Sequence, residues 1–176
     1  MKLKLSVCVL IMLALVAFGL GYGTVSGFAD DRAQVMALLE GENGLGDVLS
    51  YRAADGLNLC VVARRHLAQG DVAPLELAAR ELLGAQTVEE YLEKDAALTN
   101  AVTEVSRRLA ADAGFAQSTR DVRYLDMLTA DMQNLSASAA VTTYNAAAAD
   151  FNAQLDAPLF GALAKLLGIK PCTLYQ

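Results

Sequence analysis

The sequence predicts an all-α protein, with an N-terminal transmembrane helix followed by an antiparallel bundle of three to four long helices. Three observations lead to this prediction. An uncharged apolar run fills residues 5–22, alanine and leucine dominate the rest, and apolar residues recur at alternating steps of three and four between residues 88 and 142. The 176 residues suit one domain plus an anchor. We therefore divide the chain into an anchor (1–28), a helical bundle (29–157) and an apolar C-terminal tail (158–176).

The anchor is the segment LSVCVLIMLALVAFGLGY, residues 5–22. Its length reaches the lower range of a membrane-spanning helix, so we expect it to lie in the lipid bilayer. Lys2 and Lys4 precede it, and Asp30 follows. Because positive residues stay on the cytoplasmic side, we expect a single-pass protein of the bacterial cell membrane with a cytoplasmic N-terminus and an exported domain.

A cleaved signal peptide is the alternative reading of the same segment. Gly27-Phe28-Ala29 offers small residues at a plausible processing site. The apolar core of a signal peptide covers about 7–15 residues, however, and this run is longer, which favours a retained anchor.

Three glycines, Gly19, Gly23 and Gly27, recur at four-residue spacing and would share one helical face. Such a face lets a second helix approach closely, so a homo-oligomer through Gly19, Gly23 and Gly27 is one interpretation. The other is that glycine loosens the end of the span.

Between the anchor and residue 84 the sequence predicts two helices. Residues 29–40 continue the anchor helix, and three glycines within 41–46 indicate a break. A helix over 47–67 should end at Gly70. Asp71 and Pro74 then open a short amphipathic helix that ends at Gly84.

Two longer helices follow. Thr87 and Glu90 form a capping-box pattern at the start of the first, which we expect Gly114 to end. Ser118 and Asp121 offer the next cap, and the absence of Gly and Pro from there to Pro158 predicts one long helix. The first carries the seam Val88, Tyr91, Asp95, Leu98, Val102, Val105 and Leu109. The second carries Leu125, Leu128, Met132, Leu135, Ala139 and Thr142, after which the apolar stripe shifts to Val141, Tyr144, Ala148, Phe151 and Leu155.

The order of these pieces resembles the LemA family of membrane-anchored helical proteins. Residues 144–152, YNAAAADFN, are similar to the family's YNxAxxDYN stretch, and Leu159-Phe160 through Gly168-Ile169-Lys170-Pro171 is similar to its LFGFKP close. Residues 52–59, RAADGLNL, resemble its RADLIPNLV segment but lack the proline. The resemblance implies a membrane-tethered bundle of long antiparallel helices.

The charge balance bears on the class of partner. The net charge is −6, and Lys2 and Lys4 are the only charges before residue 30. An acidic surface without a basic, aromatic-rich patch disfavours binding to nucleic acid or to anionic lipid.

The spacing of the cysteines and the histidine does not indicate a catalytic Cys–His pair. His66 is the single histidine and follows Arg64 and Arg65, so we expect it to face solvent. Cys60 precedes it by six residues, which is not one helical face. In an exported domain, Cys60 and Cys172 could form a disulfide.

The sequence also lacks the common metal-binding motifs. Glu40, Glu42 and Asp47 lack the spacing of a calcium-binding loop, and a single histidine does not supply a zinc or di-iron motif. The cluster Tyr144, Asn145, Asp150, Phe151 and Asn152 could be a docking face, but we favour a core role with the asparagines bonding across helices.

We therefore predict no enzyme activity, no catalytic, metal or cofactor-binding residues and no cofactor. The expected role is binding or scaffolding of an unidentified protein partner at a membrane. The alternative is a subunit, or an enzyme of a membrane or envelope complex, that uses a site these patterns do not reveal.

Overall fold

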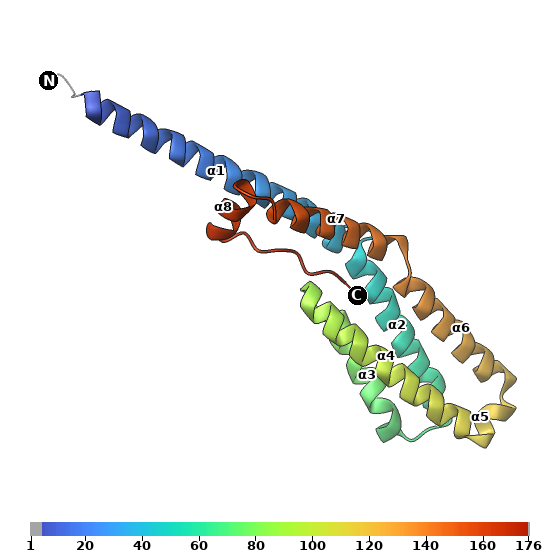
Figure 1. Ribbon diagram of the computed structural model, residues 1–176. Helices are drawn as coiled ribbons and strands as arrows, with labels where there is room; N and C mark the ends of the chain where they lie inside the picture. Colours follow the sequence, from blue (N-terminus) through green and yellow to red (C-terminus); the bar gives the residue numbers. More distant parts are fainter. Residues whose placement is uncertain (1–4, 176) are drawn as a thin grey trace. The chain divides into compact units, whose positions relative to one another are not determined.

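The protein is all-helical, as the sequence predicts. The structure, a computed structural model, describes residues 5–175, with side chains from residue 7 onward. This part of the chain contains helices and turns but no strand. Its helices are α1 (Leu5–Glu40), α2 (Leu45–Ala63), α3 (Gln69–Leu83), α4 (Val88–Ala111), α5 (Ala113–Gln117), α6 (Thr119–Ser136), α7 (Ala139–Leu155) and α8 (Phe160–Leu166) (Figure 1).

Near the N-terminus, one helix among the described residues is long and apolar enough to cross a membrane. An 18-residue window there has a mean hydropathy of 2.2, and none of it is buried in the protein. Leu10, Leu15 and Phe18 are each at least 66% exposed. The lysines used to predict its orientation, Lys2 and Lys4, lie outside the described residues.

The chain forms two compact units. One contains the described residues up to Ala37 together with Ala146–Cys172, and the other contains Leu38–Asn145 together with the C-terminal residues from Thr173. In the first unit, the rings of Phe28 and Phe151 meet edge to face with centroids 6.2 Å apart. These two rings join α1 to α7.

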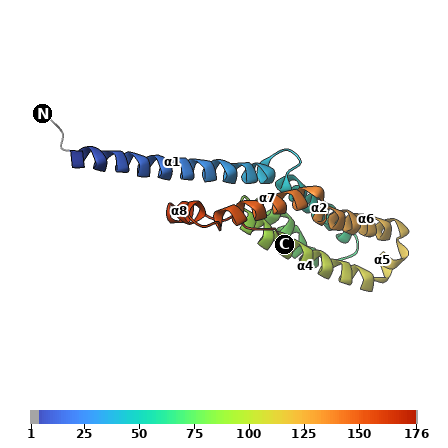
Figure 2. The ribbon, with the colours of Figure 1, turned by 45° about the horizontal axis from the view of Figure 1, so that its top comes forward.

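The second unit is organised around α2, which packs against α3, α4 and α6 (Figure 1). Gly56 makes close packing possible, because a Cβ placed there would lie 2.8 Å from Leu98 Cδ1 of α4 and 3.3 Å from Ala79 Cβ of α3. Helix α2 runs through this glycine without interruption. The short α5 links the end of α4 to the start of α6 and contacts both helices (Figure 2).

Two predicted glycine stops are wrong. Helix α2 ends at Ala63 and not near Gly70, because the amides of His66 and Leu67 turn back to the Ala63 carbonyl. Gly70 instead lies inside α3. Helix α4 ends at Ala111, where Asp112 begins α5 by accepting a 2.7 Å hydrogen bond from the Phe115 amide. Gly114 lies within that next helix.

Other predicted helix ends are confirmed. Thr87 and Glu90 form the complete capping box of α4. Ser118 is the N-cap of α6 and accepts from the Asp121 amide, and Gly84 caps the end of α3. The glycine-rich break is also present, because α1 stops at Glu40 and α2 begins at Leu45.

The predicted long helix up to Pro158 is wrong, because α6 ends at Ser136 and α7 starts at Ala139. Arg52 of α2 donates hydrogen bonds to the Met132 carbonyl and to Ser136 Oγ in the last turn of α6. The amides of Ala137 and Ser138 then turn to carbonyls three residues back. The shift of the apolar stripe near residue 140 therefore marks a helix break.

Candidate binding surface

A buried ion pair lies at the centre of the second unit. Arg52 of α2 is 5% exposed, and its Nε lies 2.7 Å from Asp95 Oδ1 of α4. Its Nη2 donates to Thr99 Oγ1 at 3.0 Å, in addition to the two bonds to α6. One guanidinium thus joins α2, α4 and α6, and its charge is balanced by the carboxylate.

The C-terminal segment closes this network. The Tyr175 hydroxyl donates to Asp95 Oδ2 at 2.5 Å, and burial together with the neighbouring carboxylate raises the pKa of Tyr175. Asn145 holds the same residue in place, because its Oδ1 accepts from the Tyr175 amide at 2.8 Å and its Nδ2 donates to the Tyr175 carbonyl at 2.5 Å. Thr173 is held as well, because its carbonyl accepts from the Tyr144 hydroxyl at 2.8 Å.

A groove of about 350 Å³ opens beside Arg52. Most of its lining surface is apolar, but several of the lining residues carry hydroxyl or amide groups: Thr99, Thr103, Ser106, Thr129, Gln133 and Ser136. Because Asp95 neutralises Arg52, this groove offers hydrogen bonds and no net charge.

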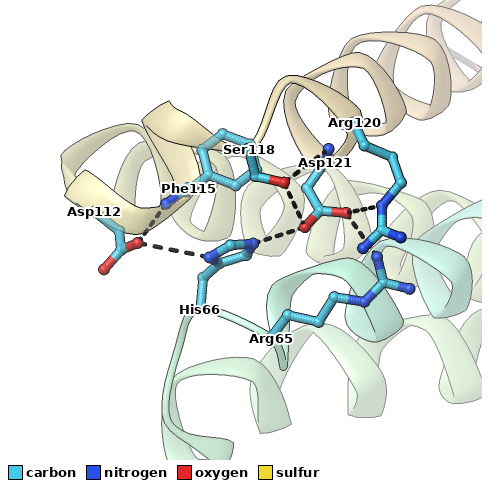
Figure 3. A network of polar contacts seen from close by, with 7 residues as sticks. All are labelled: Arg65, His66, Asp112, Phe115, Ser118, Arg120 and Asp121. Carbon is cyan, nitrogen blue, oxygen red and sulfur yellow. Dashed lines mark hydrogen bonds and ion pairs between the residues drawn. The ribbon is translucent and has the colours of Figure 1, made fainter.

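The second polar cluster joins the end of α2 to the start of α6 (Figure 3). His66 Nε2 lies 2.9 Å from Asp121 Oδ2, and its Nδ1 lies 3.7 Å from Asp112 Oδ1. The ring also packs edge-on against Phe115, with centroids 5.3 Å apart. The prediction that His66 faces solvent is therefore wrong, since its side chain is only 12% exposed.

Asp121 is the centre of this cluster. Two arginines, Arg65 at 2.6 Å and Arg120 at 3.3 Å, approach its Oδ1, while Ser118 Oγ donates to its Oδ2 at 2.9 Å (Figure 3). The hydrogen bond from His66, supported by those from Ser118 and Arg65, holds the pKa of Asp121 well below its usual value. The carboxylate is therefore ionised throughout the physiological range.

The cluster does not have the geometry of a catalytic triad. In a triad the histidine takes a proton from the nucleophile, so serine and histidine must be hydrogen-bonded to each other. Here Ser118 and His66 both bond to the carboxylate of Asp121. The arrangement fastens two helix ends together.

An apolar groove of about 330 Å³ lies between α2 and α6 beside this cluster. Val61, Tyr124 and Met127 line it and are between 44% and 54% exposed. Arg65 and Arg120 also line it, so the groove combines an apolar floor with two guanidinium groups. Tyrosine, methionine and arginine are the side chains enriched in protein interfaces.

Cys60 is not placed as a nucleophile. It is a buried free thiol, so the structure does not contain the Cys60–Cys172 disulfide. Burial raises the pKa of the thiol to about 11, which keeps it protonated and unreactive at neutral pH.

Tyr144 and Phe151 are buried, which agrees with the predicted core role. The prediction that the asparagines bond across helices is wrong. Like Asn145, Asn152 pairs with tail backbone: its Oδ1 accepts from the Cys172 amide at 2.8 Å, and its Nδ2 donates to the Cys172 carbonyl at 2.7 Å. The repeated asparagine thus serves to hold the extended C-terminal segment.

At the glycine break, the Asp47 carboxylate accepts a 2.8 Å hydrogen bond from the Asn43 amide and so stabilises the turn. Within residues 5–175, no group of three or more His, Cys, Asp or Glu side chains could hold a metal ion. No protein-family model, curated protein or solved structure matches the chain.

Proposed function

We propose that the protein is anchored in a bacterial cell membrane by α1 and that its second unit binds a protein partner without catalysing a reaction. The observation that carries the anchor is the exposed apolar stretch of α1, none of which is buried against other described residues. Burying such a stretch in lipid removes a large apolar area from water. The helix is oriented with its N-terminus in the cytoplasm.

Membrane fractionation and cysteine labelling test the anchor. Leu13→Arg combined with Val16→Arg should move the protein from the alkali-resistant membrane fraction to the soluble fraction, because charges are costly at the centre of a span. Both positions are more than half exposed, so the substitutions spare the packed parts of the protein. Labelling of Glu93→Cys by an impermeant maleimide in intact spheroplasts should show an exported second unit. Retention of the double arginine variant in membranes would refute the anchor.

The partner-binding surface is the groove between α2 and α6. Its exposed apolar side chains and the guanidinium groups of Arg65 and Arg120 suit a protein segment that carries apolar residues and a carboxylate. Charge complementarity supports this choice, because Asp121 balances only one of these two arginines, which leaves a positive charge at the groove on a chain whose net charge is −6.

Site-specific photo-crosslinking in cells tests the groove. A photoreactive amino acid at Met127 should give a discrete adduct that Arg120→Glu abolishes. The matched control is the same amino acid at Leu77, which is an exposed apolar residue of α3 in the same unit. Identical adducts from Met127 and Leu77, or none from Met127, would refute the assignment.

Membership of the LemA family is part of this proposal. What supports it is the YN and FN spacing of residues 144–152 and the Lys-Pro close of the tail. The hydrogen bonds of Asn145 with Tyr175 and of Asn152 with Cys172 supply a physical reason for the spacing of the two asparagines.

The proposal for the membrane segment also includes self-association of α1 through Gly19, Gly23 and Gly27. A Cβ at any of the three would meet nothing within 4 Å, so the face is open to a second helix. Gly19→Leu with Gly23→Leu should lower the yield of crosslinked dimer in membranes. An unchanged yield would end this part of the proposal.

A further inference from the structure

Helix α8 carries an exposed apolar face. Its residues are spaced so that they lie on one side of the helix, and they are 49–82% exposed: Leu159, Phe160, Leu166 and Leu167. The opposite side is fixed to the protein. Gly161 and Ala164 are buried, and a Cβ at Gly161 would collide with the Leu155 carbonyl at the end of α7.

The turn into α8 directs the side chain of Leu159 outward. Leu159 has a φ of 72°, a backbone conformation that leucine rarely adopts, and its side chain is 80% exposed. Burial of the leucine side chain does not explain this conformation, because the side chain is largely exposed. Strain of this kind is common at sites that bind something.

The charge around α8 differs from that of the rest of the chain. No acidic residue follows Asp156, whereas Lys165 and Lys170 lie in this segment. Lys165 pairs with Asp156 beside the helix. An apolar face next to lysines is the pattern of helices that lie in the headgroup region of a bilayer.

The position of α8 within the first unit matches that environment. Its following turn, Gly168–Lys170, shares a pocket with Ala29, Arg32 and Met36 of α1. In α1, residues 7–20 are all exposed, and partly buried residues begin at Gly21. The α1 residues of the pocket follow shortly after this exposed apolar stretch. The turn of α8 therefore contacts α1 where that helix would leave the membrane.

We propose that α8 lies flat on the membrane surface, with Leu159, Phe160, Leu166 and Leu167 in the headgroup region of the bilayer that holds α1. This inference rests on the proposed function, because it needs α1 to be in the bilayer. It adds a second membrane contact more than a hundred residues from the first.

Tryptophan fluorescence tests this directly, because the protein contains no tryptophan. Leu13→Trp, Leu166→Trp and Leu77→Trp each give a single reporter at an exposed apolar position, in α1, α8 and α3 respectively. The full-length variants are reconstituted into phosphatidylcholine and phosphatidylglycerol vesicles. The acyl chains carry bromine near either the carbonyl end or the methyl end.

The proposal expects a tryptophan at 166 to be quenched several-fold more by bromine near the carbonyl end than by bromine near the methyl end. The reporter at 13 should show the reverse order, and the reporter at 77 should be quenched by neither. Failure of quenching at 13 would overturn the anchor and this inference with it. Normal quenching at 13 with none at 166, or with equal quenching at 166 and 77, would overturn the α8 contact alone. A concentration-dependent emission shift at 166 without quenching would replace lipid by a second copy of the chain.

Discussion

Replacing Asp95 with alanine probes how the second unit is held together. Among the described residues, Asp95 is the one acidic partner of Arg52, whose side chain is 6% exposed, and its carboxylate also accepts a hydrogen bond from the Tyr175 hydroxyl. Asp95→Ala therefore leaves a buried cation without its counter-ion and removes the hydrogen bond from Tyr175 to α4. We expect a large loss of stability from a single small substitution.

The magnitude follows from the bonds that are lost. Each hydrogen bond to a charged group contributes about 1.5–3 kcal/mol, and breaking a buried ion pair costs about 3–5 kcal/mol. Arg52 keeps three neutral acceptors, Met132 O, Ser136 Oγ and Thr99 Oγ1, and water can reach it from the adjoining groove. We therefore expect the lower end, about 3 kcal/mol, which is a change of about a hundredfold in the unfolding equilibrium.

Urea unfolding of the full chain in detergent micelles, followed by far-ultraviolet circular dichroism, measures this loss. Glu93→Ala is the matched control, because its side chain lies on the same helix and is 77% exposed. Tyr175→Phe removes only one bond to the carboxylate and should cost about 1.5–3 kcal/mol. The double variant Arg52→Met with Asp95→Ala should lose less stability than Asp95→Ala alone, because no buried charge remains. A loss below about 1 kcal/mol for Asp95→Ala would refute this account of the ion pair.

Three further predictions concern other parts of the second unit. Asp121→Asn should lower stability at neutral pH. Because folding lowers the pKa of Asp121, its ionised carboxylate stabilises the folded protein above pH 3.8, the pKa of an ordinary aspartate. This stabilisation is lost as the pH falls below that value. The difference in unfolding free energy between Asp121→Asn and the wild type should therefore narrow only in acid. Cys60 should react with iodoacetamide about a hundredfold more slowly in the folded protein than in urea, because burial raises its pKa from 9.0 to about 11. Gly56→Leu should cost about 1–3 kcal/mol, because the new side chain would overlap Leu98.

Two of these predictions have a control variant in the same unit, and the third has an outcome that would contradict it. Asp126→Asn, on the exposed side of α6, should leave stability and its pH dependence unchanged, and equal effects of the two substitutions would contradict the role of Asp121. Fast alkylation of Cys60 in the native protein would show that the thiol is not buried. Gly70→Leu in α3 places the same side chain in open space, and a loss equal to that of Gly56→Leu would exclude overpacking as the cause.

The candidate binding surface could be predicted only in fragments. Asp95 stands out in the sequence as a charged residue within an apolar seam, which indicates a buried partner, but nothing in the pattern selects Arg52. His66 looked solvent-facing because two arginines precede it, and Asp121 was recognised only as part of a helix cap. The pairs Arg52–Asp95 and His66–Asp121 join residues 43 and 55 positions apart, and periodicity along one helix does not tell which residues of another helix face it.

Local chemistry in the sequence was sufficient for the helical class, the apolar N-terminal stretch and those helix ends that a side chain caps, as at Thr87 and Ser118. These features depend on residues within one or two turns of each other. The tertiary structure decided the break between α6 and α7, where no glycine or proline occurs. There Arg52, 80 residues away in sequence, donates to the Met132 carbonyl in the last turn of α6. The pattern of the segment that breaks carries no record of a contact from a distant helix.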